Sequence, residues 1–68
     1  MKYNERIRAL REDNDLKQYQ IAEVLNCQRE VYRRYETGIY EIPVWAVIKL
    51  AEYYQVSTDY ILGLTDKK

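Results

Sequence analysis

The apolar pattern between residues 18 and 38 constrains the fold of this chain more than any other feature. Ile21 and Leu25 are four residues apart, so they share one face of a helix that we expect to begin at Gln18. Ala22 lies beside them and is small enough to let another helix approach closely. The pattern therefore predicts a short amphipathic helix that packs against a neighbouring helix at a steep angle.

A second short helix is expected directly after a tight turn. Asn26 tolerates the left-handed conformation that ends the first helix, and Cys27 supplies a small core side chain. The second helix should run from about Gln28 to Thr37 and end at Gly38, which adopts a left-handed cap at the least steric cost. We expect Val31, Tyr32 and Tyr35 to face inward, and Gln28, Arg29, Glu30, Arg33 and Arg34 to face outward.

Three further helices complete the prediction. One should span residues 3–13, one should begin at Pro43, whose missing N–H costs nothing at a first helical position, and a short one should be capped by Ser57. No segment alternates apolar and polar residues for long enough to indicate a strand. The sequence thus predicts an all-α fold, a compact five-helix bundle. Its other inward-facing residues would be Tyr3, Ile7, Leu10, Val47, Leu50, Ala51, Tyr54, Tyr60, Ile61 and Leu64.

The length and composition are typical of one small domain. We expect this domain to span residues 1–65, with a helix-turn-helix at 18–37 and a frayed tail at 66–68. One Cys and no His allow neither an internal disulfide nor a Cys/His metal cluster. No nucleophile–base pair or Gly-rich phosphate loop stands out, so no enzyme, cofactor or small-molecule ligand is expected.

The sequence also lacks the features of a membrane or secreted protein. No apolar run approaches the about 20 residues that cross a bilayer, and no secretory signal precedes the fold. We therefore expect a cytoplasmic protein.

The central residues form a motif that can be compared with known families. Leu16-x-Gln18-x-x-Ile21-Ala22-x-x-Leu25 is followed by Arg29-x-x-Tyr32-x-Arg34-Tyr35-Glu36-x-Gly38. The pattern continues in Ile42-Pro43, Ile48-x-Leu50-Ala51 and Val56-Ser57-x-Asp59-Tyr60-Ile61-Leu62-Gly63. Over about residues 4–64 the chain resembles the phage-repressor-like Cro/CI (Xre) family of helix-turn-helix regulators. The resemblance implies a bundle of the lambda-repressor-like DNA-binding type and a sequence-specific transcriptional regulator, in particular a repressor.

The net charge is the main objection to DNA binding. The chain is formally neutral, whereas DNA-binding domains are usually basic. Residues 1–34 carry eight Lys or Arg against six Asp or Glu, and residues 35–68 carry three against five. The first half therefore has a net charge of +2, and Arg29, Arg33 and Arg34 gather on one helix face within it. This distribution still favours DNA as the partner.

Residues 28–34 hold the candidates for contacts to base edges. An α-helix fits the major groove, and Arg29 lies at the end that such motifs insert toward the bases, where Arg can pair with O6 and N7 of guanine. Arg34 matches a base-contacting position of the family; either arginine could instead contact a phosphate. Glu30 could accept from cytosine N4 or form an intrahelical pair with Arg33 or Arg34. Gln28 could start the helix, contact a phosphate or read an adenine.

Six side chains are candidates for phosphate contacts. In the family, the residue that matches Gln18 contacts a phosphate and braces the recognition helix. Tyr19 and Tyr40 each offer a hydroxyl to phosphate, or are simply exposed rings. Lys17 stands where the family places Ser or Thr, so the cap of that helix is missing or supplied by Asp15. The six candidates are Arg11, Lys17, Gln18, Tyr19, Arg33 and Tyr40.

Two structural roles follow from the resemblance and from one unusual residue. Arg11 and Glu36 match positions that form a partly buried ion pair in several family members. Trp45 occupies a position that is commonly polar, so its ring either joins an interface or folds over Ile42 or a neighbouring side chain. The candidate dimer interface is Trp45, Tyr60 and Leu64.

The expected partner is double-stranded DNA, bound by a homodimer. Two recognition helices would enter successive major grooves of a near-palindromic operator, ~34 Å apart. The alternative is a protein-binding helix-turn-helix module, such as an antitoxin component or a docking domain. The neutral charge, Glu30 and Trp45 would suit that alternative.

Overall fold

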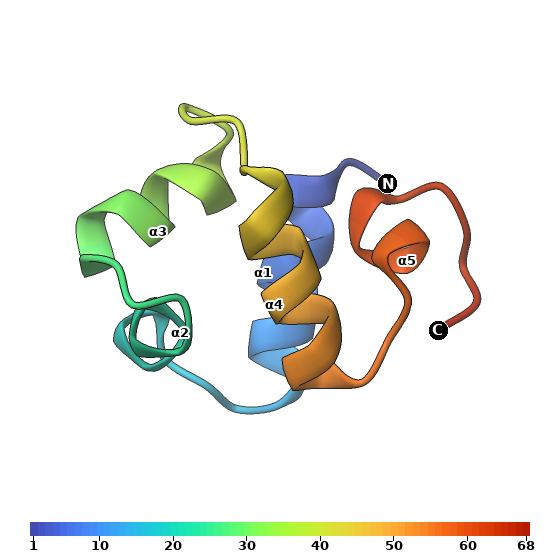
Figure 1. The fold of residues 1–68 in the computed structure, drawn as a ribbon, viewed down its shortest axis with the longest axis horizontal. Helices are drawn as coiled ribbons and strands as arrows, with labels where there is room; N and C mark the ends of the chain where they lie inside the picture. The colour runs from blue at the N-terminus through green and yellow to red at the C-terminus, as the bar shows by residue number, and fades with distance from the viewer.

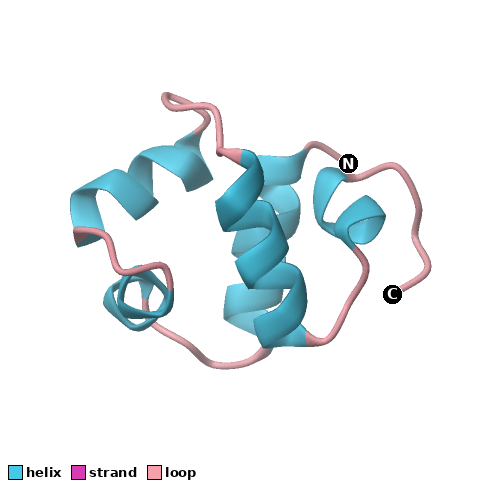
Figure 2. Ribbon diagram, viewed as in Figure 1, coloured by secondary structure: helices cyan, strands magenta, loops and turns pink.

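The computed structural model describes all 68 residues and contains five helices and no strand (Figures 1 and 2). In Figure 1, α4 crosses in front of α1 at the centre, α2 and α3 lie on one side, and α5 lies on the other together with both termini. The predicted all-α bundle is thus confirmed. None of the helices combines the length and apolar character that a membrane span requires. The helices are α1 (Tyr3–Asp13), α2 (Gln18–Val24), α3 (Arg29–Thr37), α4 (Val44–Tyr54) and α5 (Thr58–Leu62).

A single core joins all five helices. Each helix contributes at least one large side chain that is almost completely buried, and burial of such a side chain contributes about 1.5–3 kcal/mol. Because these side chains meet in one cluster, the position of α3 is fixed by the same core as the rest of the fold. The largest fully buried side chains are Ile7, Ile21, Leu25, Tyr32, Leu50 and Ile61.

Several helix ends follow the local chemistry of their residues. Asn26 has a φ of +55° in the turn before α3, and Gly38 has a φ of +83° at the end of α3. The Ser57 hydroxyl accepts a hydrogen bond from the backbone N–H of Tyr60 at 3.0 Å, as expected for the cap of α5. The predicted turns and this cap are therefore confirmed.

Other helix ends differ from the prediction. Pro43 is not the first residue of α4: its backbone is extended, and its carbonyl accepts from Ala46 and Val47, so it occupies the cap position and α4 begins at Val44. Leu64 does not face inward but is 73% exposed. Gly63 before it has a φ of +79°, which ends the helix and turns the chain away from the core.

The start of α2 lacks a side-chain cap. Of the two predicted alternatives, a missing cap or a cap supplied by Asp15, the first is therefore confirmed. Lys17 has no side chain that can accept a hydrogen bond, and Asp15 makes none to the first turn of α2. The Gln20 side chain instead reaches back and accepts from the backbone N–H of Lys17 at 2.7 Å. This bond satisfies one of the polar groups at the helix end.

The C-terminal tail makes two polar contacts. The carboxylate of Asp66 lies 3.2 Å from Nη2 of Arg6, and the carbonyl of Lys68 accepts from the backbone N–H of Ser57 at 2.9 Å. Arg6 is itself buried, with its guanidinium 3.8 Å from the centre of the Tyr60 ring. The fraying predicted for residues 66–68 stays a prediction.

Candidate nucleic-acid interface

The contact between α2 and α3 decides which face of α3 is exposed. Ala22 is buried at this contact, and its carbonyl accepts from the backbone N–H of Cys27 at 2.9 Å in the turn. Tyr32 and Tyr35 of α3 point into the core. The opposite side of α3, which begins at Arg29, therefore faces solvent.

Arg29 is the least restrained of the arginines on α3. It is the first residue of the helix, it is exposed, and it takes part in none of the ion pairs of the chain. Gln28 precedes it as the exposed residue at the cap position. A guanidinium without an internal partner is available for a ligand at this end of the helix.

Glu30 is paired within the helix. Its carboxylate accepts from Nε and Nη2 of Arg33 at 2.6 and 3.2 Å, and it lies 4.0 Å from Nη2 of Arg34. The hydrogen bond from Arg33 lowers the pKa of Glu30, and the same bond raises the pKa of Arg33. The intrahelical pairing considered from the sequence is therefore present, although the Glu30 side chain remains exposed to solvent.

A shallow depression lies at the N-terminal ends of α2 and α3. Its volume is about 300 Å³, and its lining contains three cationic side chains and no carboxylate. Such a lining is suited to an anion of the size of a phosphate group. Four of the six phosphate candidates meet here, next to one of the base candidates. The lining residues are Arg11, Lys17, Gln18, Tyr19 and Arg29.

Arg11 and Gln18 are held in place behind this depression by Glu36. Nε and Nη2 of Arg11 donate to the Glu36 carboxylate at 2.7 and 3.0 Å, and the Gln18 amide donates to it at 3.2 Å. Nη1 of Arg11 also donates to the carbonyl of Leu16 at 2.9 Å. The ion pair that the resemblance implies is thus present, and Glu36 connects α1, α2 and α3.

The electrostatics of this network follow from burial and hydrogen bonding. Burial alone would raise the pKa of Glu36, but the hydrogen bonds donated by Arg11 and Gln18 help to outweigh it, so the pKa is lowered. The bond to Glu36 in turn raises the pKa of Arg11. The carboxylate is therefore charged at neutral pH although its side chain is almost completely buried.

The two remaining phosphate candidates do not line this depression. Arg33 lines a second polar hollow of about 570 Å³ between α1 and α3, together with Asn4 and Arg8. Arg11 and Gln18 line both hollows. Tyr40 lies beyond the end of α3, where its hydroxyl accepts from Nη1 of Arg34 at 2.7 Å. Sequence reasoning did not single out Asn4 and Arg8. Asn4 and Arg8 are four residues apart, and Arg8 and Arg11 are three apart. This spacing on one helix face was the signal that could have identified them.

The three candidate dimer residues differ in how exposed they are. Trp45 is 49% exposed on α4, and Leu64 is more exposed still. Tyr60 is partly buried, and the guanidinium of Arg6 lies over its ring. Trp45 and Leu64 are therefore the members of this set that could bury substantial new apolar surface.

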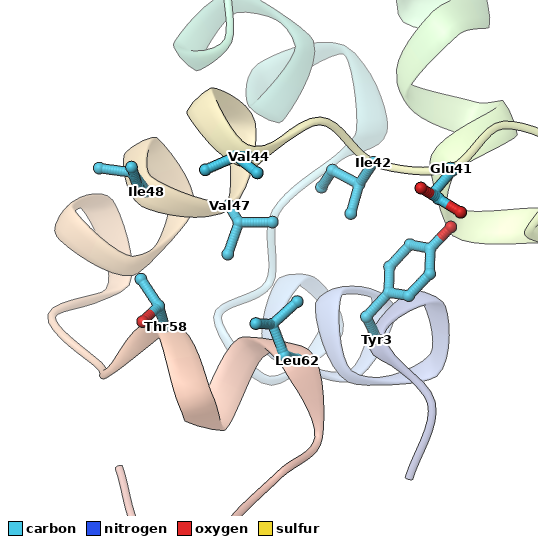
Figure 3. A pocket seen from close by; sticks show the side chains of 8 residues that line it. All are labelled: Tyr3, Glu41, Ile42, Val44, Val47, Ile48, Thr58 and Leu62. Atoms are coloured by element: carbon cyan, nitrogen blue, oxygen red, sulfur yellow. The ribbon is translucent and has the colours of Figure 1, made fainter.

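An apolar groove that the sequence did not reveal lies between α4, α5 and the start of α1 (Figure 3). Its volume is about 570 Å³. Figure 3 shows Val47 of α4 and Leu62 of α5 directed into the groove, with Tyr3 and Glu41 at one end. Val44 and Ile48 at its rim are exposed. Exposed apolar side chains that are grouped in this way are typical of protein interaction surfaces.

Comparison with known proteins agrees with this geometry. The family model described as "Helix-turn-helix" matches residues 7–61, which include the core of all five helices. The chain belongs to the helix-turn-helix family. This match confirms the family predicted from the sequence motifs. Helix-turn-helix regulators are not a class of enzymes.

Individual relatives extend the comparison. The chain is 41% identical over 64 residues to the uncharacterized HTH-type transcriptional regulator YobD of Bacillus subtilis (strain 168), a match that covers 94% of the chain and 57% of that relative. A crystal structure of a transcriptional regulator from Listeria innocua superposes with a TM-score of 0.89 at 30% identity, covering 98% of the chain and 63% of that protein. The helix-turn-helix chain thus spans less than two thirds of the length of both relatives.

A third comparison concerns the fold alone. The P22 c2 repressor, in its crystal structure with the synthetic operator 9T, superposes with a TM-score of 0.82 at 24% identity. The match covers 91% of the chain and 94% of the repressor chain in that structure. The lambda-repressor-like arrangement of the five helices, expected from the sequence, is therefore confirmed.

Proposed function

We propose that this chain is a sequence-specific DNA-binding domain of a transcriptional regulator, and that α3 enters the major groove. The observation that carries the proposal is the unpaired guanidinium of Arg29 at the start of α3, on the edge of the cationic depression that it helps to line. A phosphate held in the depression would place the duplex against the exposed face of α3, where Arg29 could pair with a guanine. The names of the relatives in Bacillus subtilis and Listeria innocua, both transcriptional regulators, support this function.

We further propose that the regulator acts as a homodimer on a near-palindromic operator. One domain offers few cations for phosphate contacts, and a second copy doubles them while it fixes the spacing of the two α3 helices at ~34 Å. Trp45 and Leu64 are exposed on α4 and after α5, where a second copy could cover them. Occupation of the operator by such a dimer would block transcription, so repression is the proposed effect. The cytoplasm is the compartment that this function implies.

The test of DNA binding is selection from a random duplex library at low and physiological salt. The wild-type domain should enrich a two-fold site with a G·C pair in each half. Arg29→Ala should lower affinity about tenfold to hundredfold for each half-site that it contacts, because one bidentate contact to guanine contributes about 1–3 kcal/mol. Lys49→Ala is the matched control, since Lys49 is an exposed, unpaired cation on α4. It should change affinity by less than about threefold.

The protein-binding module remains the second candidate, because the apolar groove favours a protein partner. Absence of any enriched duplex, together with weak salt-dependent binding that Arg29→Ala leaves unchanged, would contradict DNA recognition. The groove lined by Val44, Ile48 and Leu62 would then be the surface to test for a partner.

A further inference from the structure

The loop after α3 is folded back onto the last turn of that helix. The backbone N–H of Tyr40 donates to the carbonyl of Arg34 at 3.1 Å, and the hydroxyl of Tyr3 on α1 donates to the carbonyl of Tyr40 at 3.1 Å. The Tyr40 ring meets the ring of Tyr35 edge to face, with 6.5 Å between their centres. Both backbone polar groups of Tyr40 and its ring are therefore fixed by the rest of the fold.

The anchored Tyr40 holds the side chain of Arg34. Nη1 of Arg34 donates to the Tyr40 hydroxyl at 2.7 Å, and Nη2 lies 4.0 Å from the Glu30 carboxylate. An arginine side chain has many rotamers, and ordering it on binding weakens affinity. The guanidinium has five N–H groups, of which the Tyr40 hydroxyl uses one, and the side chain is 38% exposed. Arg34 is thus oriented before any ligand arrives and keeps donors for that ligand.

We propose that Tyr40 is a positioning residue for base recognition by Arg34, in place of the direct phosphate contact expected from the sequence. This inference rests on the proposed function. The hydroxyl of Tyr40 fixes the direction of the guanidinium, and the guanidinium reads the base. Tyr40 thereby determines how strongly the domain discriminates one base pair in each half-site, although it does not touch that base pair.

The test is a double-mutant cycle with Tyr40→Phe and Arg34→Ala. The first probe is the duplex most enriched in the random-library selection. Selection with Arg34→Ala identifies the base pair at which this variant loses its preference. The second probe is the same duplex with that base pair changed. Tyr40→Phe keeps the ring against Tyr35 and removes only the hydroxyl, so its thermal unfolding should match the wild type. In the wild-type background it should lower affinity for the enriched duplex about tenfold and weaken discrimination at that one base pair.

In the Arg34→Ala background the same change should alter affinity by less than about twofold, because the side chain that Tyr40 positions is then absent. Tyr53→Phe is the matched control. Tyr53 is an exposed tyrosine whose ring also meets another tyrosine edge to face, that of Tyr54. Tyr53→Phe should leave affinity unchanged in both backgrounds.

Three results would overturn the inference while leaving DNA binding intact. If Tyr40→Phe lowered duplex affinity equally in both backgrounds, Tyr40 would instead contact a phosphate directly. An unchanged affinity in the wild-type background, or an Arg34→Ala variant that binds like the wild type, would remove the positioning role. Failure of the wild-type domain to enrich any duplex would instead remove the proposed function, and the role of Tyr40 with it.

Discussion

Replacement of Glu36 by Gln should destabilise the domain through the charge that it leaves on Arg11. The Glu36 side chain is almost completely buried and accepts two hydrogen bonds from Arg11 and one from Gln18. Glutamine has nearly the same shape, so the change removes the negative charge without opening a cavity. The Arg11 side chain, only 13% exposed, then has no carboxylate to balance its charge.

The size of the effect can be worked out from these contacts. Removal of one partner from a buried ion pair costs about 3–5 kcal/mol. Arg11 keeps its bond to the carbonyl of Leu16 and some contact with water, so the loss should lie at or just below the bottom of that range, at about 2–3 kcal/mol. A domain of this length has a total stability of roughly 3–10 kcal/mol. The midpoint of thermal unfolding should therefore fall by about 10–20 °C.

The pH dependence gives a second, independent readout. Because the pKa of Glu36 is lowered in the folded chain, its charge stabilises the domain above the unfolded value of about 4.3. This stabilisation is lost as the pH falls through the folded pKa. The difference between wild type and Glu36→Gln should therefore be constant between about pH 7 and about pH 5, and it should shrink below about pH 4.

Urea unfolding, followed by circular dichroism at several pH values, measures the loss of unfolding free energy and its dependence on pH. Glu52→Gln is the control, because Glu52 is exposed on α4 and belongs to no ion pair, and it should change stability by less than about 0.5 kcal/mol. The reasoning would be refuted if Glu36→Gln unfolded at the same urea concentration as the wild type, or if the difference persisted unchanged in acid.

Three smaller predictions concern charge, capping and backbone conformation. Glu30→Gln should free Arg33 for phosphate and steepen the dependence of DNA affinity on salt by about one unit of slope per subunit, whereas an unchanged slope would mean that Arg33 stays away from DNA. Ser57→Ala should lower the free energy of unfolding by about 1 kcal/mol through loss of the α5 cap, and an unchanged urea midpoint would contradict that role. Gly63→Ala should destabilise more than Gly38→Ala, since both positions have positive φ but only at Gly63 would the new methyl group collide with the backbone of the first residue; equal melting temperatures would disprove this.

The limits of α3 could be predicted from the sequence because they depend on local chemistry. Gly38 permits the left-handed conformation that ends the helix, and the inward positions of Tyr32 and Tyr35 follow from helical spacing. Leu64 was assigned wrongly because helical spacing was extended beyond Gly63, where the chain leaves the helix. Local patterns thus predicted the positions of the helices well. They predicted burial wrongly where a helix ended before its apolar pattern did.

The contact between Arg34 and Tyr40 could not be predicted, because it depends on the path of the loop between α3 and α4 and on the hydrogen bond from Tyr3, far away in the sequence. The apolar groove was missed for a different reason. Val44 and Ile48 are four residues apart on α4, and apolar residues at that spacing normally indicate a core. Only the arrangement of α4 relative to α5 shows that these two side chains remain exposed.

Amide chemical shifts of the isotope-labelled domain, followed during titration with the enriched duplex, test the central claim most directly. If α3 enters the major groove, the largest changes should occur at residues 28–34, with further changes at residues 17–19 around the cationic depression. Changes confined to residues 44–48 and 58–62 around the apolar groove, with none along α3, would contradict the proposed mode of DNA recognition.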